Sequence, residues 1–320
     1  MSTIQRSYLP GSQWVYLKLY TGEKTADDLL IQVIAPVVKR LQKNRHIEKW
    51  FFIRYADPDF HLRIRLLARD SQFIGEILHL FYQKLDIWNR DRLLWKVQLD
   101  TYNRELERYR KHLIEEAESV FCADSACILS ILKDLNGNEN HRWMIALKLI
   151  DELLSDFGLN TEAKQKLMEE VSKTYKTEFG FTEFNAKQFN TKFRDNKKTV
   201  ESVLNKESLN SAMSLLAKRS EDPQSPENYQ EMAGQARHDR DFISLCQPIK
   251  KRSRQLKPVA GQIKIKSKKE GEVNELLKSY LHMMINRLFR SNNRLHELIL
   301  YDFMSRYYAS EIAKEKYNKK

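Results

Sequence analysis

The spacing of apolar residues changes once along this chain, near residue 105, and this change constrains the fold more than any other feature. Before it, short segments alternate apolar and polar residues, as in WVYLKLY at Trp14–Tyr20, which is typical of β-strands. After it, apolar residues recur every three or four positions almost to the C-terminus, which is typical of amphipathic helices. The sequence therefore predicts a mixed β and α part over residues 1–104 and a mainly helical part over residues 105–320.

The predicted elements of the first part follow the order strand, helix, strand, strand, helix, strand. Short strands with helical connections favour a mainly antiparallel sheet covered by helices, which is an α+β fold. We expect both parts to form a single domain over residues 1–320. The strands are expected at Trp14–Tyr20, Lys49–Tyr55, His61–Leu67 and Leu93–Tyr102, and the helices at Thr25–Asn44 and Ser71–Leu85.

One stretch interrupts the helical pattern of the second part. Gln247–Gly271 contains Pro248, Pro258 and Gly261, and its GQIKIKSK segment alternates, so we expect a mobile basic loop with room for a short hairpin strand. The helices of this part are expected at 105–120, 124–135, 140–157, 161–176, 184–205, 207–219, 226–245, 271–290 and 293–316.

Charge and cysteine content narrow the class of protein. The 320 residues carry a net charge of +12, and nine basic residues lie in Lys250–Lys269. This suggests an anionic partner such as nucleic acid or an acidic peptide, although lysine-rich surfaces also serve solubility alone. Three cysteines without a CxxC spacing argue against a disulfide scaffold or zinc site, so a reducing cytoplasm is expected. No segment approaches the roughly 18 apolar residues of a membrane span, and no apolar signal core is present at the N-terminus.

A first group of candidate site residues lies on the second and third expected strands. Alternate side chains of a strand share a face, so His61, Arg63 and Arg65 line up together. Three cationic groups repel one another unless an anion lies among them, and arginine suits bidentate binding of a carboxylate. Together with Arg54 they are candidates for a carboxylate-binding wall. A solvated sheet face with acidic neighbours is the alternative.

Two further groups lie on expected helices. Glu105 and Arg108, in TYNRELERY, are neighbours at i, i+3, and an ordinary surface ion pair is the alternative. His282, in SYLHMMINRLF, shares a helical stripe with Asn286, with Arg287 beside it. A histidine on a largely apolar helix can act as an acid or base near neutrality, and a buried structural histidine is the alternative. The usual nucleotide, zinc-protease and serine-hydrolase motifs are missing, so no cofactor and no metal is expected.

Four segments in order resemble a known family. WVYLKLY, WFFIRYADPDFHLRIR, TYNRELERY followed by ADS, and HMMINRLF are similar to the SpaB C-terminal domain, also called the thiopeptide-type bacteriocin biosynthesis domain, and their spacing fits over nearly the whole chain. This is the C-terminal, glutamate-eliminating domain of lantibiotic dehydratases. In these enzymes a separate domain esterifies Ser or Thr of a precursor peptide with glutamate from glutamyl-tRNA, and this domain expels the glutamate to leave dehydroalanine or dehydrobutyrine.

The resemblance implies roles for the candidate residues. His282 matches the catalytic histidine of the family and would act as acid or base. Arg63 and Arg108 would hold the glutamyl group or stabilise developing negative charge, with Arg65 as second choice to Arg63, and Glu105 would orient an arginine. The residues expected to bind substrate are Arg54, His61, Arg65, Asn286 and Arg287.

One position departs from the family pattern. Members often carry glycines after ERY, whereas Arg110 and Lys111 follow Tyr109 here. Either the helix continues through these residues or the rim of the pocket differs.

The resemblance also implies partners. The chain has no room for the large glutamylation domain, so a split system with a separate glutamylating enzyme is expected. The precursor peptide is a second partner and the cyclase of the same pathway a further candidate. Neither a direct tRNA requirement nor membrane insertion is expected.

Two other functions stay open. Thiopeptide pyridine synthases share the fold and join two dehydroalanines in a formal cycloaddition, but the presence of Glu105, Arg108 and His282 together favours elimination. A non-catalytic RNA- or peptide-binding module is suggested by the charge of +12 and by Lys250–Lys269.

Overall fold

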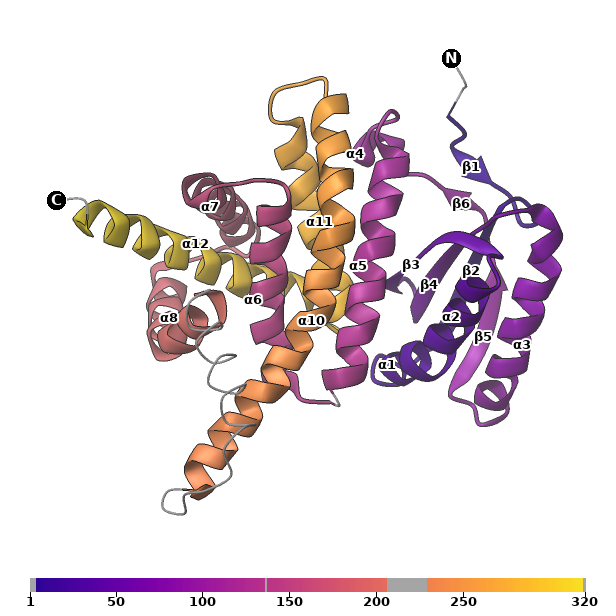
Figure 1. The fold of residues 1–320 in the computed structure, drawn as a ribbon, viewed down its shortest axis with the longest axis horizontal. Helices are drawn as coiled ribbons and strands as arrows, with labels where there is room; N and C mark the ends of the chain where they lie inside the picture. Colours follow the sequence, from indigo (N-terminus) through magenta and orange to yellow (C-terminus); the bar gives the residue numbers. More distant parts are fainter. Residues whose placement is uncertain (1–3, 136, 206–228, 319–320) are drawn as a thin grey trace, which may run out of the picture. The chain divides into compact units, whose positions relative to one another are not determined.

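The computed structural model of the chain describes residues 4–135, 137–205 and 229–318 (Figure 1). The chain forms two compact units, each built from two segments. We call Met1–Lys133 with Arg254–Asn293 the sheet unit, and Asp134–Ser253 with Arg294–Lys320 the helical unit.

The sheet unit contains a four-stranded antiparallel sheet. Its strand order is β3-β4-β2-β5, and every neighbouring pair is antiparallel. A separate two-stranded ribbon pairs β1 with β6. The predicted α+β class with a mainly antiparallel N-terminal sheet is therefore confirmed. The strands are β1 (Ser7–Tyr8), β2 (Trp14–Thr21), β3 (Ile47–Ala56), β4 (Phe60–Ala68), β5 (Leu94–Leu99) and β6 (Tyr102–Asn103).

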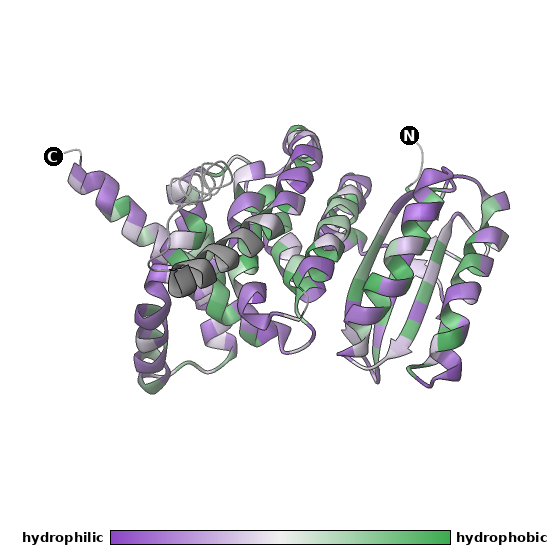
Figure 2. Cartoon of the chain, turned by 60° about the horizontal axis from the view of Figure 1, so that its bottom comes forward, coloured by the Kyte–Doolittle hydropathy of each residue, from purple (hydrophilic) through white to green (hydrophobic). Residues whose placement is uncertain are grey.

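Helices connect the strands in the expected order, which gives the ferredoxin-like βαββαβ arrangement. Leu62, Ile64 and Leu66 of β4 point to one face of the sheet and are fully buried. Figure 2 shows green apolar and purple hydrophilic residues alternating along these strands and helices. The connecting helices are α1 (Thr25–Leu29), a π-helical turn (Leu30–Ile34), α2 (Ala35–Lys43), a 3-10 turn (Ser71–Phe73) and α3 (Ile74–Arg90).

The outer edge of β3 is closed by side chains rather than by another strand. Asn286 on α11 (Glu272–Leu288) binds both backbone groups of Arg54. Arg287 Nε donates to the carbonyl oxygen of Phe52 at 2.8 Å, and the amide of Phe52 donates to Ser125 Oγ at 3.2 Å. A free strand edge leaves backbone groups unpaired and invites association. These contacts satisfy the edge and hold α11 and α5 (Ile114–Leu135) against the sheet.

The portion predicted to be mainly helical, residues 105–320, is mainly helical where it is described, but it is divided between the two units, because α11 and nearly all of α5 belong to the sheet unit. Asn138, Asn160 and Thr182 cap the N-termini of the first three helices of the helical unit with side-chain oxygens, as N-cap residues do. The predicted helix at 207–219 lies outside the described residues. The helices of this unit are α6 (Glu139–Asp156), α7 (Thr161–Glu178), α8 (Glu183–Leu204) and, for most of its length, α12 (Asn293–Asn318).

The prediction of a basic loop over 247–271 is wrong for most of that stretch, because α10 runs from Tyr229 to Lys266. Ile249, Leu256 and Ile263 are spaced by seven residues and are buried. Burial of each such side chain is worth about 1.5–3 kcal/mol. Together these gains offset the cost of about 3 kcal/mol for a proline inside a helix. Among the described residues, no helix combines the length and the apolarity needed to cross a membrane.

Candidate functional site

A small cavity of about 30 Å³ lies within the sheet unit. Strands β3 and β4 supply Ile53 and Arg65, the short helix α4 (Leu106–Tyr109) supplies Tyr109, and α11 supplies Met283 and Arg287. Its volume is of the size that holds a water molecule or the end of a carboxylate, about 30 Å³.

Arg65 brings a buried positive charge to this cavity. Its side chain is only 8% exposed, and its guanidinium lies over the rings of Tyr16 and Tyr102, at 4.5 and 5.1 Å from their centroids. Cation–π contacts offset part of the cost of burial. Within the described part of the chain, however, no carboxylate pairs with Arg65 and no acceptor reaches its Nε. A buried donor without an acceptor costs about 1–3 kcal/mol, and an oxygen atom of a bound ligand would offset this cost.

Arg287 and Tyr109 each present another unused donor. Arg287 Nη1 is bound to Asp124 Oδ2 at 3.0 Å, but its Nη2 has no acceptor among the described residues. The hydroxyl of Tyr109 likewise has none there. Burial raises the pKa of Tyr109 to about 12, so the phenol keeps its proton near neutrality and can donate it. Three residues with a buried donor that lacks an acceptor among the described residues therefore line one small volume.

Arg108 and Glu105 lie at the rim of this cavity. Arg108 Nε donates to Ser279 Oγ on α11 at 3.1 Å, and its Nη1 is 3.6 Å from Glu105 Oε2. Glu105 also lines the cavity. The side chain of Arg108 is about one-third exposed, so it can contact a ligand from the solvent side.

His282 lies on α11, close in helix position to residues with known contacts. Ser279, Met283 and Asn286 contact α4, the cavity and β3 in turn. Residues three and four positions apart share a helix face, and His282 is three after Ser279 and four before Asn286. Of the sequence-based candidates, Arg65, Glu105 and Arg287 line the cavity, whereas Arg108, His282 and Asn286 do not.

Arg63 and His61 lie further along β4, away from the cavity lining. Arg63 stacks over the ring of Tyr55 at 3.4 Å and donates to His61 Nε2 at 3.1 Å. His61 Nδ1 therefore carries the proton and donates to the carbonyl oxygen of Asp59 at 2.8 Å. Burial and the nearby positive charges of Arg63 and Lys18 lower the pKa of His61. The imidazole is consequently neutral at pH 7.

Arg54 is on the opposite face of the sheet. Its Nη2 is 2.5 Å from Asp27 Oδ1, and its Nε donates to the carbonyl oxygen of Arg287. The structure does not bring Arg54 to the cavity. The side-chain amide of Asn286 forms hydrogen bonds with the backbone of Arg54 at the edge of β3. The catalytic and substrate-binding roles of all these residues stay predictions.

Sequence reasoning did not single out Tyr109 as a site residue. The residue stands in the quoted TYNRELERY segment, directly after Arg108. Its position beside the candidates Glu105 and Arg108 could have indicated a site residue. Only the packing of α4 shows that the Tyr109 hydroxyl is buried without an acceptor among the described residues.

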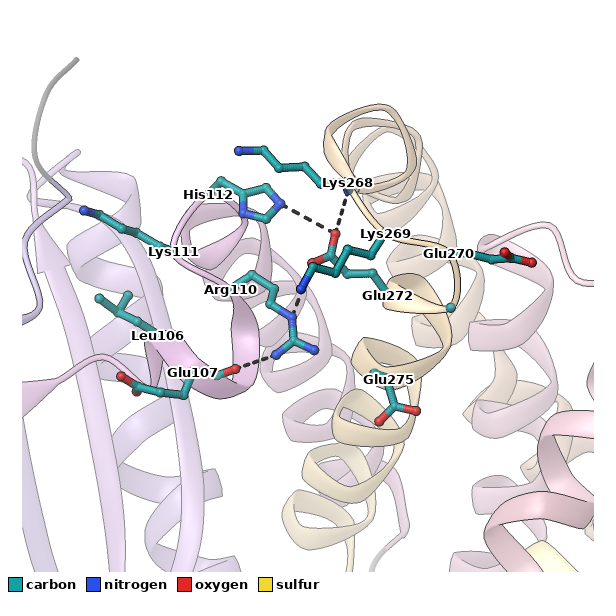
Figure 3. Close-up of a pocket in the computed structure, with 11 residues that line it drawn as sticks. Leu106, Glu107, Arg110, Lys111, His112, Lys268, Lys269, Glu270, Glu272 and Glu275 are labelled. Atoms are coloured by element: carbon teal, nitrogen blue, oxygen red, sulfur yellow. Dashed lines mark hydrogen bonds and ion pairs between the residues drawn. The ribbon is translucent and has the colours of Figure 1, made fainter.

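The helix α4, which begins after Glu105 and contains Arg108, does not continue through Arg110. Arg110 has φ 66° and ψ 135°, a backbone conformation that favours glycine. Its Nε lies 3.3 Å from Glu272 Oε1 at the start of α11, and His112 Nε2 lies 3.6 Å from Glu272 Oε2 (Figure 3). The amide of Lys268 also donates to Glu272, at 2.8 Å.

Glu272 ties the turn after α4 to the start of α11. The side chain is buried, which by itself raises the pKa of its carboxyl, but the amide of Lys268 and the charges of His112 and Arg110 outweigh this effect and lower the pKa. These groups line an open pocket of about 670 Å³ (Figure 3), separate from the small cavity. Of the two alternatives, the helix does not continue through Arg110, and a difference at the rim of the substrate pocket stays a prediction.

The chain matches the family described as lantibiotic biosynthesis dehydratase C-term over residues 14–308. It is 31% identical over 143 residues to the nisin biosynthesis protein NisB of Lactococcus lactis subsp. lactis, which covers 43% of this chain and 14% of that protein. It is 27% identical over 186 residues to the subtilin biosynthesis protein SpaB of Bacillus subtilis, which covers 54% of this chain and 17% of that protein. The matched region thus spans about a sixth of the length of these curated relatives.

Solved structures share the fold at low identity. The tRNA-dependent lantibiotic dehydratase MibB from Microbispora sp. 107891 superposes with a TM-score of 0.62 at 21% identity, over 93% of this chain and 28% of that chain. TbtD, a pyridine synthase from thiomuracin biosynthesis, superposes with a TM-score of 0.61 at 11% identity, over 94% of this chain and 99% of that chain. Because the family match extends over nearly all of its residues, this protein belongs to the lantibiotic biosynthesis dehydratase C-terminal family.

Proposed function

We propose that this protein eliminates glutamate from glutamylated Ser or Thr residues of a ribosomally synthesised precursor peptide, leaving dehydroalanine or dehydrobutyrine. The observation that carries the proposal is the cavity in which Arg65, Arg287 and Tyr109 present three unused donors. Such a site suits a reaction whose leaving group is a carboxylate, since donors placed where negative charge develops lower the barrier most.

The reaction needs one proton transfer and one bond cleavage. A base removes the α-proton of the esterified residue, and the electron pair forms a double bond between Cα and Cβ. The bond from Cβ to the ester oxygen breaks, and its electrons leave with glutamate as a carboxylate. His282 is the proposed acid or base, because an imidazole exchanges protons near neutrality.

The arginines would act on the glutamyl group. Arg65 and Arg287 would stabilise the departing carboxylate together with the hydroxyl of Tyr109, in a buried setting where charge interactions are strong. Arg108 would bind the remainder of the glutamyl group from the rim, with Glu105 orienting it. We assign the principal strand arginine to Arg65 in preference to Arg63, because Arg65 lines the cavity.

The ester substrate must come from another activity. We propose a separate enzyme that esterifies the precursor peptide with glutamate, so that this protein acts on a peptide that arrives already modified. The relatives contain much more chain than the matched region, which leaves room in those proteins for such a step.

The test is the mass of the product formed from a synthetic peptide that carries one glutamyl-serine ester. Loss of glutamic acid, giving a dehydroalanine peptide faster than in buffer, supports the proposal, and His282→Gln should abolish the acceleration. An intact ester, alongside ring closure of a peptide with two dehydroalanines, would instead show a pyridine synthase. Binding of either peptide without any change of mass would show a non-catalytic module.

A further inference from the structure

The two edges of the four-stranded sheet differ in whether their outward backbone groups have hydrogen-bond partners. The edge of β3 is closed by Asn286, Arg287 and Ser125, as described above. At the other edge, β5 pairs with β2 and with no further strand among the described residues. An edge strand with unpaired backbone groups is a template for pairing with another chain.

The register shows which backbone groups of β5 point outward. The amide of Asp100 donates to the carbonyl oxygen of Tyr16 at 3.1 Å. In an antiparallel pair, hydrogen-bonded pairs alternate along the strands, so Gln98 and Lys96 also exchange their hydrogen bonds with β2. The N–H and C=O groups of Val97, and the amide of Leu99, therefore face away from the sheet.

The side chains of this edge are apolar and half exposed. Trp95 is 53% exposed, Val97 47% and Leu99 44%. Alternation with polar residues would lead one to expect Val97 and Leu99 to be buried on one face of the sheet, yet nearly half of each side chain is exposed. Ile87 at the end of α3 is exposed as well. Natural proteins usually protect such edges with charge, proline or a covering element, and β5 carries a single lysine, Lys96.

Charge distinguishes between possible occupants. Lys96 lies over the ring of Tyr20 at 4.9 Å and forms no ion pair with a carboxylate in the described part of the chain. A second copy would oppose one net charge of +12 with another, which disfavours association. An acidic segment would instead be attracted and would give Lys96 a carboxylate.

We propose that the outer edge of β5 binds an extended segment of another polypeptide in which apolar and acidic residues alternate. The segment would add as a further strand, with its backbone bonded to Val97 and Leu99. Its apolar side chains would pack beside Trp95, and an acidic side chain would meet Lys96. This mode takes affinity from backbone hydrogen bonds and specificity from alternate side chains. It concerns binding alone and does not depend on the elimination reaction.

A fluorescent synthetic peptide of alternating Val and Glu residues is the probe, with fluorescence anisotropy as the readout. Val97→Pro removes the outward N–H without removing a hydrogen bond to β2, because proline is tolerated at a strand edge. We expect it to weaken binding by about tenfold or more, which corresponds to about 1.4 kcal/mol. Val97→Thr keeps the amide and is the matched control, which should bind within about threefold of the unchanged protein.

Lys96→Glu tests the charge and does not depend on how well the proline variant folds. It should weaken binding of the Val/Glu peptide and strengthen binding of a Val/Lys peptide. Hydrogen exchange of the Val97 amide should slow when the Val/Glu peptide is bound. The proposal would be overturned if Val97→Pro bound the Val/Glu peptide as tightly as the unchanged protein. It would also be overturned if Lys96→Glu did not reverse the preference for the Val/Glu peptide over the Val/Lys peptide. A concentration-dependent dimer that Val97→Pro abolishes would overturn it as well, because a second copy would then be the occupant.

Discussion

Asn286 binds Arg54 in the way that a neighbouring strand would. Its Nδ2 donates to the carbonyl oxygen of Arg54 at 2.9 Å, and its Oδ1 accepts from the amide of Arg54 at 3.0 Å. One side-chain amide thus replaces two backbone partners at the edge of β3. The same contact fixes α11 along the sheet and with it Met283 and Arg287, which line the cavity.

Replacing Asn286 should therefore destabilise the fold. Asn286→Ala leaves two backbone groups of Arg54 without a protein partner, and each such group costs about 1–3 kcal/mol where water cannot replace it. The measurement is the free energy of unfolding by chemical denaturation. Asn89→Ala, on the exposed side of α3, is the control and should change this free energy by less than about 0.5 kcal/mol. A stability equal to that of the control would show that the contact does not hold α11.

Arg65 and Arg63 form a matched pair for the catalytic proposal, because they share a strand and a face. Arg65→Gln should lower the elimination rate by about a hundred- to a thousandfold, and Arg63→Gln by less than about tenfold. Arg65→Lys should not restore activity, since lysine lacks the planar fork of donors. The rate is followed by mass spectrometry of the glutamyl ester, with unfolding curves to confirm that each variant folds. A larger loss for Arg63→Gln would reassign the strand arginine.

Tyr109→Phe separates stability from activity. The hydroxyl has no acceptor among the described residues, so its removal should leave the free energy of unfolding unchanged or slightly raised. The elimination rate should fall by about tenfold or more, because one donor to the leaving carboxylate is lost. A fall in stability without a fall in rate would argue that the hydroxyl has a structural partner instead.

Arg110 combines an unfavourable backbone with a favourable ion pair. Arg110→Ala loses the contact with Glu272 and keeps the left-handed backbone, whereas Arg110→Gly loses the contact and relieves the strain. The glycine variant should therefore be more stable than the alanine variant by about 1–3 kcal/mol. Denaturant unfolding of both variants measures the difference directly, and equal stabilities would contradict a strained turn.

The stability of the sheet unit should fall below neutral pH because of His61. Its pKa is lowered in the folded chain, whereas in the unfolded chain it titrates near its usual value of about 6.5. Below that pH the unfolded state binds more protons, so unfolding is favoured as the pH falls towards the folded pKa. Thermal melting between about pH 5 and 8 should show this slope, and His61→Gln should reduce it. An identical slope in the variant would assign the effect to other groups.

The local pattern of apolar and polar residues was sufficient to predict the strands and helices of most of the first hundred residues. The alternation in WVYLKLY and HLRIRLL predicted β2 and β4, and the order of strands and helices predicted the antiparallel α+β arrangement. These features follow from the side-chain period of each element, which is a property of neighbouring residues alone. For the same reason the sequence placed His61, Arg63 and Arg65 on one face.

Local pattern failed where distant contacts outweigh local preference. Pro258 and Gly261 indicated a loop, yet the buried stripe of α10 keeps the segment helical. Arg110 was compatible with a continuing helix, yet the helix ends there and Arg110 pairs with Glu272.

The sequence by itself determined the candidates Arg63, Arg65, Glu105, Arg108 and His282, because their residue types and spacings can be read along the chain. Only the tertiary structure decided which of them share a cavity. Alternation cannot separate Arg63 from Arg65, since both face the same way. The docking of α4 and α11 beside β3 encloses Arg65 and leaves Arg63 stacked on Tyr55. That choice depends on contacts between residues far apart in the chain, which no local period encodes.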